Sequence, residues 1–280
     1  MAGSMVERAS TVLSRCNDGV REMNPHAIII ELCLLQLPIR KVEFKDQRGP
    51  TCGLYALSFV LEYLYDIKIP ATADGDKTRE SLRNRFKKDG KTVIGELYDA
   101  TSSMADYIKA LDPSKITCQS VACDVAAIIE TLNGGGLCMV PFCVDASGKP
   151  DHSGIHAHWC VLLNVREVAG TAVACHWGKD HVFNLSQLEE SNKAIKDVEE
   201  QYWGKIPAAS YSFSIPIEGL NYVQCKTNTD TSCKCEYPLP FPIKSGSIKS
   251  IPAKPLSQTL AGKMLVFRNN GSCDENAVSQ

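Results

Sequence analysis

Apolar side chains recur every three or four residues after the turn formed by Gly49 and Pro50, at Leu54, Leu57, Val60, Leu61 and Leu64. This spacing predicts a helix with one buried stripe, and it places Cys52 at or beside the helix N-terminus. A similar pattern predicts a second helix from about residue 97 to 111, ending before Pro113. The polar stretch 71–91 between them predicts a loop and a solvated face.

The middle of the chain alternates between apolar runs and turn residues. Asp124 can cap a helix over 125–132, which three glycines then end, and the apolar run 137–144 predicts a strand. Residues 156–165 and 171–177 predict two further strands, joined by a short turn. These two strands are expected to form a β-hairpin.

The last third of the chain gives weaker signals. Ser186 and Glu189 have the spacing of a capping box, which predicts a helix through about Val198. Residues 211–217 alternate as a half-exposed strand does, and 264–267 could form a last strand. The stretch 221–262 is rich in Pro, Ser, Thr and Lys, so we expect a long loop-rich excursion.

Composition indicates an ordinary globular chain. Of 280 residues, 44% are hydrophobic and 22% charged, and the formal net charge is −2. That balance argues against a nucleic-acid partner. We find no apolar run long enough to span a membrane and no secretory h-region, so we expect a cytosolic protein whose 13 cysteines are reduced.

The stretch Gln47-Arg48-Gly49-Pro50-Thr51-Cys52-Gly53-Leu54 carries the strongest chemical signal. A helix N-terminus favours the thiolate of Cys52, because the free N–H groups and aligned peptide dipoles stabilise negative charge. Those N–H groups and the Gln47 amide can hold an oxyanion, and Gly53 leaves room for an incoming carbonyl. The alternative is that Cys52 is one buried core cysteine among several.

A cysteine nucleophile needs a histidine base, which can lie far away in the sequence. His158 starts the predicted strand His158-Trp159-Cys160-Val161-Leu162-Leu163, with its side chain on the face opposite Trp159. His176, near the end of the paired strand, is our candidate for the group that orients the imidazole. The alternatives for that third group are Asn164, Asp180 and Asn184.

Two clusters raise the question of a metal. One contains His152, His156 and His158, and the other contains Cys225, Cys233 and Cys235. Structural zinc sites usually have paired Cys-x2-4-Cys spacing, which the cysteines lack, and a fourth ligand such as Cys273 would be distant. We expect no metal and no cofactor.

Three segments together resemble the actin maturation proteases: residues 47–57, the step Ala157-His158-Trp159, and the stretch from Ser186 to Asn192 that ends in Glu190-Ser191-Asn192. The resemblance implies an α+β, papain-like cysteine peptidase fold, in which a helical lobe carrying the Cys packs on an antiparallel sheet carrying the His. It also implies a cytosolic aminopeptidase that removes the N-acetylated first residue, Met or Cys, of immature actin through a thioester.

By this resemblance Cys52 is the nucleophile, Gln47 the oxyanion donor and His158 the base. Actin is then the expected partner, with Arg48 and the basic run 83–88 as candidates to receive its acidic segment. The proline-rich extension of some family members is not seen, so profilin is not an expected partner. Two alternatives stay open: a papain-like or deubiquitinase-like hydrolase acting on another substrate, and a catalytically inactive binding module.

The expected organisation has four parts. Residues 1–36 form a partly structured N-terminal segment, in which 27–37 reads as either a buried strand or a short helix. Residues 37–220 form the peptidase domain, 221–262 the excursion, and 263–280 a last strand and tail.

Overall fold

A computed structural model describes residues 47, 50–73, 79–92, 94–197, 205–207, 220–225, 247–252 and 254–269. The chain divides into two units, residues 1–40 and residues 41–280, and every described residue belongs to the second. The apolar run 27–37 and the strand expected at 211–217 lie outside the described residues.

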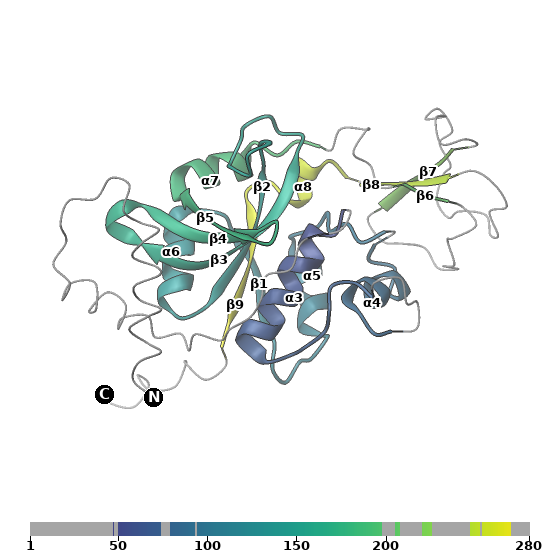
Figure 1. The fold of residues 1–280 in the computed structure, drawn as a ribbon, viewed down its shortest axis with the longest axis horizontal. Coiled ribbons are helices and arrows are strands. Elements are labelled where there is room, and N and C mark those ends of the chain that lie inside the picture. The colour runs from purple at the N-terminus through teal and green to yellow at the C-terminus, as the bar shows by residue number, and fades with distance from the viewer. Residues whose placement is uncertain are drawn as a thin grey trace. The chain divides into compact units, whose positions relative to one another are not determined.

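Helix α3 (Cys52–Tyr65) confirms the first predicted helix (Figure 1). Its apolar stripe is buried, with Leu54, Leu57 and Leu61 fully inaccessible to solvent. Asp66 follows in the left-handed conformation (φ 56°) and ends the helix. Cys52 is the first residue of this helix.

A six-stranded antiparallel sheet forms the centre of this unit (Figure 1). Its strands, in spatial order, are β1 (Thr117–Ala122), β9 (Lys263–Arg268), β2 (Leu137–Cys143), β3 (Ala157–Arg166), β4 (Thr171–His176) and β5 (Lys179–Asn184). Strands β2, β3, β4 and β9 confirm the sequence prediction, including the β3–β4 hairpin, whereas β1 and β5 were missed. Because β9 lies between β1 and β2, residues 263–268 share a sheet with the strand that carries His158.

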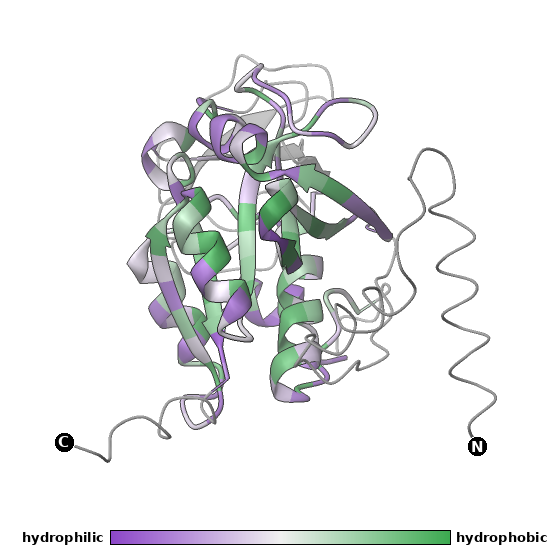
Figure 2. Ribbon diagram, turned by 90° about the vertical axis from the view of Figure 1, so that its left-hand side faces the viewer, coloured by the Kyte–Doolittle hydropathy of each residue, from purple (hydrophilic) through white to green (hydrophobic). Residues whose placement is uncertain are grey.

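The two faces of the sheet bury different sets of residues. Trp159 and Val161 of β3 join one hydrophobic cluster with α3, α4 (Leu82–Lys88) and α5 (Ser102–Lys109). Cys160 and Leu162 of the same strand join a second cluster with α6 (Val125–Asn133) and α7 (Leu185–Lys193). Figure 2 shows hydrophobic segments along the strands and along the helices around them. The protein is therefore α+β, with helices packed on both faces of the sheet.

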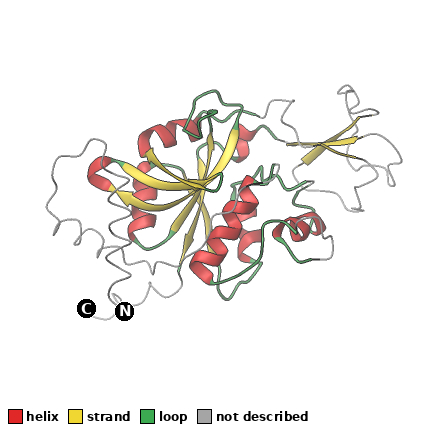
Figure 3. Ribbon diagram, in the orientation of Figure 1, coloured by secondary structure: helices red, strands yellow, loops and turns green. Residues whose placement is uncertain are grey.

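One helix was not predicted and another differs from the prediction in its bounds (Figure 3). Helix α4 interrupts the expected loop 71–91, since the Ser81 hydroxyl caps it by accepting the Asn84 N–H (3.2 Å) and Leu82 and Phe86 are buried. Helix α7 begins one residue before the expected capping box and ends at Lys193, before the expected Val198. Its cap is Asn184, whose side chain accepts the Gln187 N–H.

The other two predicted helices are found. Asp124 Oδ1 accepts the Ala127 N–H (2.8 Å) at the start of α6, as expected. Helix α5 begins at Ser102 rather than near residue 97, so residues 97–101 form a non-helical segment ahead of it.

The expected excursion 221–262 contains regular structure. Strands β6 (Lys205–Pro207), β8 (Ser247–Pro252) and β7 (Leu220–Cys225) form a separate three-stranded antiparallel sheet in that spatial order. A short helix, α8 (Leu256–Thr259), precedes β9. The described part of the stretch 221–262 therefore includes strand and helix beside loop. Among the described residues, no helix is long and apolar enough to cross a bilayer.

Candidate active site

Cys52 occupies the N-terminus of α3, as the sequence predicts. Thr51 precedes it without a side-chain cap, so backbone N–H groups of the first turn are left for another acceptor. Cys52 is partly exposed as a residue, while six other cysteines are buried: Cys118, Cys123, Cys138, Cys143, Cys160 and Cys175. Cys52 is therefore the most exposed of these seven cysteines.

The charge state of this thiol differs from the expectation. Burial of the sulfur by surrounding atoms raises the pKa of Cys52 from 9.0 to about 11, while the backbone N–H groups of Trp159, Gly53 and Cys52 itself act in the opposite direction. The prediction of a low pKa at the helix N-terminus is wrong for this conformation, because desolvation outweighs the peptide dipoles. The thiol is protonated at neutral pH, so forming the thiolate requires a base.

Gly53 does not face open space as expected. A Cβ atom placed there would lie 2.6 Å from Leu97 Cβ and 2.8 Å from Leu97 Cδ2. The Leu97 carbonyl also accepts a hydrogen bond from the Trp159 indole (2.9 Å). Gly53 therefore allows the segment around Leu97 to pack closely against α3 and β3.

His158 lies on β3 with its ring among aromatic side chains. The ring packs edge-on against Phe142 (centroids 5.8 Å apart) and His176 (5.0 Å), and lies 5.2 Å from the Trp177 ring. Burial, followed by the charges of His176 and His181, lowers the pKa of His158 to about 3. The ring is therefore neutral at pH 7, and its buried Nε2 has no hydrogen-bond partner in the described part of the chain.

His176 lies at the end of β4, beside His158 as the predicted hairpin implies. Its Nε2 lies 2.9 Å from the Gly148 carbonyl oxygen, and only a protonated nitrogen can donate to that acceptor. Nδ1 is then a bare lone pair, and it too is buried without a partner among the described residues. Burial and the neighbouring charge of His181 lower the pKa of His176 to about 4.

His181 completes a cluster of three histidines that the sequence prediction missed. Its ring stacks on His176, and Trp177 lies over both His158 and His176 from a tight turn in which its φ is 49°. Gly178 follows at φ 68°, so two residues with positive φ join β4 directly to β5. The Trp177-Gly178 pair was the available signal for this hairpin, and it turns His181 back onto His176.

Cys52 contacts β3 at the backbone of the residue that follows His158. The Cys52 sulfur lies within hydrogen-bonding reach of the Trp159 N–H, the residue directly after His158. The described residues show no hydrogen bond between the Cys52 sulfur and the His158 ring. The structure thus brings His158 and His176 together and sets Cys52 against the adjoining peptide.

The rival third groups have other contacts. Asp180 Oδ1 accepts the Cys175 thiol (2.8 Å), Asn184 caps α7, and Asn164 lies at an irregularity of the β3–β4 register. Gln47 is partly buried, and its neighbours Arg48 and Gly49 lie outside the described residues. His176 is the one candidate for the third group whose ring contacts His158.

No group of three or more metal-ligating side chains arranged around a common point occurs in the described ranges. Cys225 belongs to β7, whereas Cys233, Cys235 and Cys273 lie outside those ranges.

A family model for the C-terminal domain of actin maturation protease-like proteins matches residues 42–165. The match includes Gln47, Cys52 and His158 in one segment. The chain is also 28% identical over 159 residues to the actin maturation protease of Drosophila melanogaster. In this part of its length the chain is similar to the actin maturation proteases. The alignment spans 54% of this chain and 55% of the Drosophila actin maturation protease, so about half of that relative has a counterpart here.

Proposed function

We propose that the chain is a cysteine aminopeptidase that removes the N-acetylated first residue, Met or Cys, from immature actin. The observation that carries the proposal is the position of Cys52, at the N-terminus of α3 and against the peptide that follows His158. A helix delivering a thiol and an antiparallel sheet delivering an imidazole is the plan of a papain-like peptidase. The peptidase domain then comprises residues 37–220 together with β9.

The first chemical step is acylation. Cys52 Sγ attacks the carbonyl carbon of the acetylated first residue, and its proton passes to His158. The Cys52 backbone N–H and the Gln47 amide stabilise the oxyanion. His158 then gives the proton to the departing amine as the C–N bond breaks, which leaves a thioester on Cys52 and releases the shortened chain.

Water completes the cycle. His158 takes a proton from the water that attacks the thioester, and the acetylated amino acid leaves as the Cys52 thiol is restored. Proton transfer requires the His158 ring to approach the sulfur more closely. Contacts of this kind often tighten only when substrate is bound.

His176 suits the role of orienting group because it has an unused hydrogen-bond acceptor that could pair with an unused donor on His158. A His158 tautomer protonated at Nε2 has a donor without an acceptor, and His176 Nδ1 is an acceptor without a donor. A hydrogen bond between them would leave Nδ1 of His158 as the basic nitrogen and stabilise the imidazolium that forms. The Gly148 carbonyl holds His176 in the required tautomer.

Arg83 supports an acidic substrate. A Cβ atom on Gly95 would lie 2.4 Å from Thr51 Cγ2 and 3.6 Å from Arg83 Cδ, so Arg83 and the residue that precedes Cys52 both lie against Gly95. Its Nε is buried, and no acceptor for it exists in the described part of the chain. A carboxylate of the residue after the cleaved bond could accept from this guanidinium.

The reduced state of the cysteines supports a cytosolic location. Seven cysteines of the described part of the chain, Cys52 among them, are free thiols. A nucleophilic thiol also requires a compartment in which it stays reduced.

The test is incubation of the purified protein with acetylated actin N-terminal peptides, followed by mass spectrometry. We expect loss of one acetylated residue with the wild type and none with Cys52→Ala or His158→Ala. An intact peptide after incubation with the wild type overturns the actin assignment. Cleavage of unrelated peptides alone would indicate another cysteine peptidase, and binding without cleavage an inactive module.

A further inference from the structure

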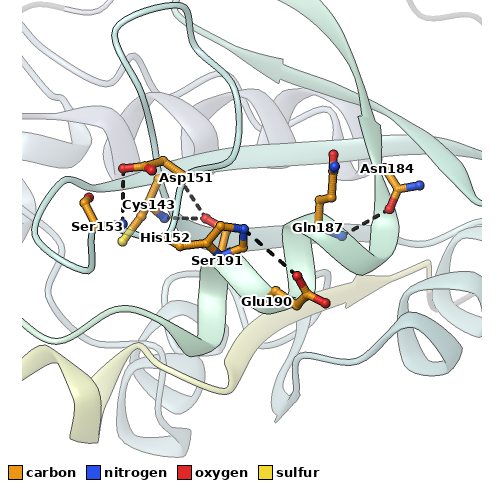
Figure 4. A network of polar contacts seen from close by, with 8 residues as sticks. All are labelled: Cys143, Asp151, His152, Ser153, Asn184, Gln187, Glu190 and Ser191. Carbon is orange, nitrogen blue, oxygen red and sulfur yellow. Dashed lines mark hydrogen bonds and ion pairs between the residues drawn. The ribbon is translucent and has the colours of Figure 1, made fainter.

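The C-terminal half of α7 is bonded to the backbone of β2. Ser191 Oγ accepts the Cys143 N–H (3.0 Å) and donates to the Cys143 carbonyl (2.8 Å), so one hydroxyl satisfies both backbone groups of that residue (Figure 4). Ser191 is fully buried. The same carbonyl accepts the Asp151 N–H (2.8 Å), which ties the loop after β2 to this point.

The next residue bridges two strands. Asn192 Nδ2 donates to the Pro141 carbonyl (2.7 Å) on β2 and to the Lys263 carbonyl (3.0 Å) on β9. The β2–β9 ladder ends at Met139 opposite Leu265, and two more residues along that register would place Pro141 opposite Lys263. Because proline has no N–H to donate, the Asn192 amide takes the place of the missing ladder bond.

Phe142 lies between these two anchored residues. It is the direct cross-strand partner of His158, and its ring also packs edge-on against His176 (5.5 Å). The loop anchored at Cys143 carries Gly148, which holds the His176 tautomer. Both imidazoles therefore rest on backbone that Ser191 and Asn192 fix.

We propose that Ser191 and Asn192 are positioning residues for His158, acting through Phe142 and the loop that carries Gly148. The proposal rests on the role given to His158 above. If packing were the only requirement, apolar residues could replace Ser191 and Asn192 at this end of α7. They would avoid the energetic cost of a buried polar group that lacks a hydrogen bond. Hydrogen bonds of fixed direction instead set the position of one short piece of β2, which is what a reacting imidazole requires. Both residues lie beyond the segment 42–165 that the family model matches.

The test compares Ser191→Ala with Asn184→Ala. Ser191→Ala removes both bonds to Cys143, whereas Asn184→Ala removes the cap at the opposite end of α7 and touches no bond to β2. We expect Ser191→Ala to lower kcat about 10- to 100-fold with little change in KM, because a small misplacement of a reacting group costs this much. Asn184→Ala should lower Tm and leave kcat unchanged.

A second readout is independent of substrate. Nuclear magnetic resonance of the histidine rings should show altered His158 shifts and an altered His158 pKa in Ser191→Ala, and unchanged ones in Asn184→Ala. If Ser191→Ala does not fold, Phe142→Leu serves instead, since it keeps the anchored backbone and changes only the ring under His158. The proposal is overturned if the His158 signals stay in place in the folded variant, or if both α7 variants lose activity in proportion to stability. If the wild type cleaves no actin peptide while the His158 signals still move, the proposed function fails and the positioning role stands.

Discussion

The imidazole of His176 stacks on that of His181, with ring centroids 4.1 Å apart and an interplanar angle of 25°. The edge of His158 meets the same ring from another direction. Burial lowers the pKa of all three histidines, to about 3 for His158 and about 4 for His176. Burial therefore favours the neutral form of all three rings.

This cluster predicts that the fold loses stability in mild acid. Below pH ~6.5 the histidines of the unfolded chain bind protons, whereas the buried histidines of the folded chain do not. Lower pH therefore favours the unfolded state. The stability that the fold gains from the neutral cluster is fully present above pH ~6.5 and is lost as the pH falls towards 4 and 3. For His158 alone the free energy of unfolding should fall by up to about 1.4 kcal/mol per pH unit in this range. Urea unfolding at pH 7.5, 6.5 and 5.5 measures it.

The matched variants are His158→Gln and His152→Gln. His158→Gln should flatten the pH dependence, and His152→Gln, at an exposed position, should leave it as in the wild type. A wild-type free energy of unfolding that does not change between pH 7.5 and 5.5 would contradict the prediction.

Cys52 should react with iodoacetamide slowly at neutral pH and faster as the pH rises, because its pKa is raised to about 11. It should still be labelled before the six buried cysteines of the described residues. Mass spectrometry of labelled peptides across pH 6 to 10 gives the profile. A rate plateau below pH 7 that His158→Ala abolishes would instead reveal a preformed thiolate–imidazolium pair.

The helix of Cys52 and the hairpin of His158 were predictable because each has a clear local period. The stripe from Leu54 to Leu64 can be satisfied only by a helix with one buried face. The alternation in His158-Trp159-Cys160 likewise fixed which side chains of β3 share a face. Local pattern thus gave both elements that carry the candidate catalytic residues.

Long-range packing decided what the sequence pattern could not. Burial in the folded protein raises the pKa of Cys52 and outweighs the N–H groups of the helix and of Trp159, which lower it, so the local helix dipole gave the wrong direction. His181 lacked any sequence neighbour of interest, and its role comes from a turn in which Trp177 adopts positive φ. The place of β9 inside the sheet follows from strand pairing that no local periodicity encodes.

His176→Ala should slow acylation without unfolding the protein. The variant removes the lone pair that is proposed to accept from His158, so the rate should fall about 10²-fold, the lower end of the effect of an acid–base group. His176→Asn, which can present an amide oxygen, should recover part of that loss. Single-turnover release of the shortened peptide, with circular dichroism as the folding control, measures both. An unchanged rate in His176→Ala removes this residue from the catalytic group.

Arg83→Ala should raise KM for peptides with Asp or Glu after the cleaved residue by about 10-fold, as expected for loss of a charge-assisted hydrogen bond. Peptides with Asn or Gln at that position should show little change. Lys88→Ala, on the exposed side of α4, is the control for general loss of positive charge. Equal effects of the two variants would indicate that the whole basic run acts only by long-range attraction.

Gly53→Ala should destabilise the fold although alanine is the better helix former. The added Cβ would stand 2.6 Å from Leu97 Cβ, and the Trp159 indole holds the Leu97 backbone against any shift. Overpacking of this kind costs about 1–3 kcal/mol, which exceeds the gain of about 1 kcal/mol from replacing glycine in a helix. Gly134→Ala is the control, since its Cβ would meet the nearest atom at 3.3 Å. Thermal unfolding of both variants measures these changes in stability. A Gly53→Ala protein at least as stable as the wild type would show that the 97–101 segment can move away from α3.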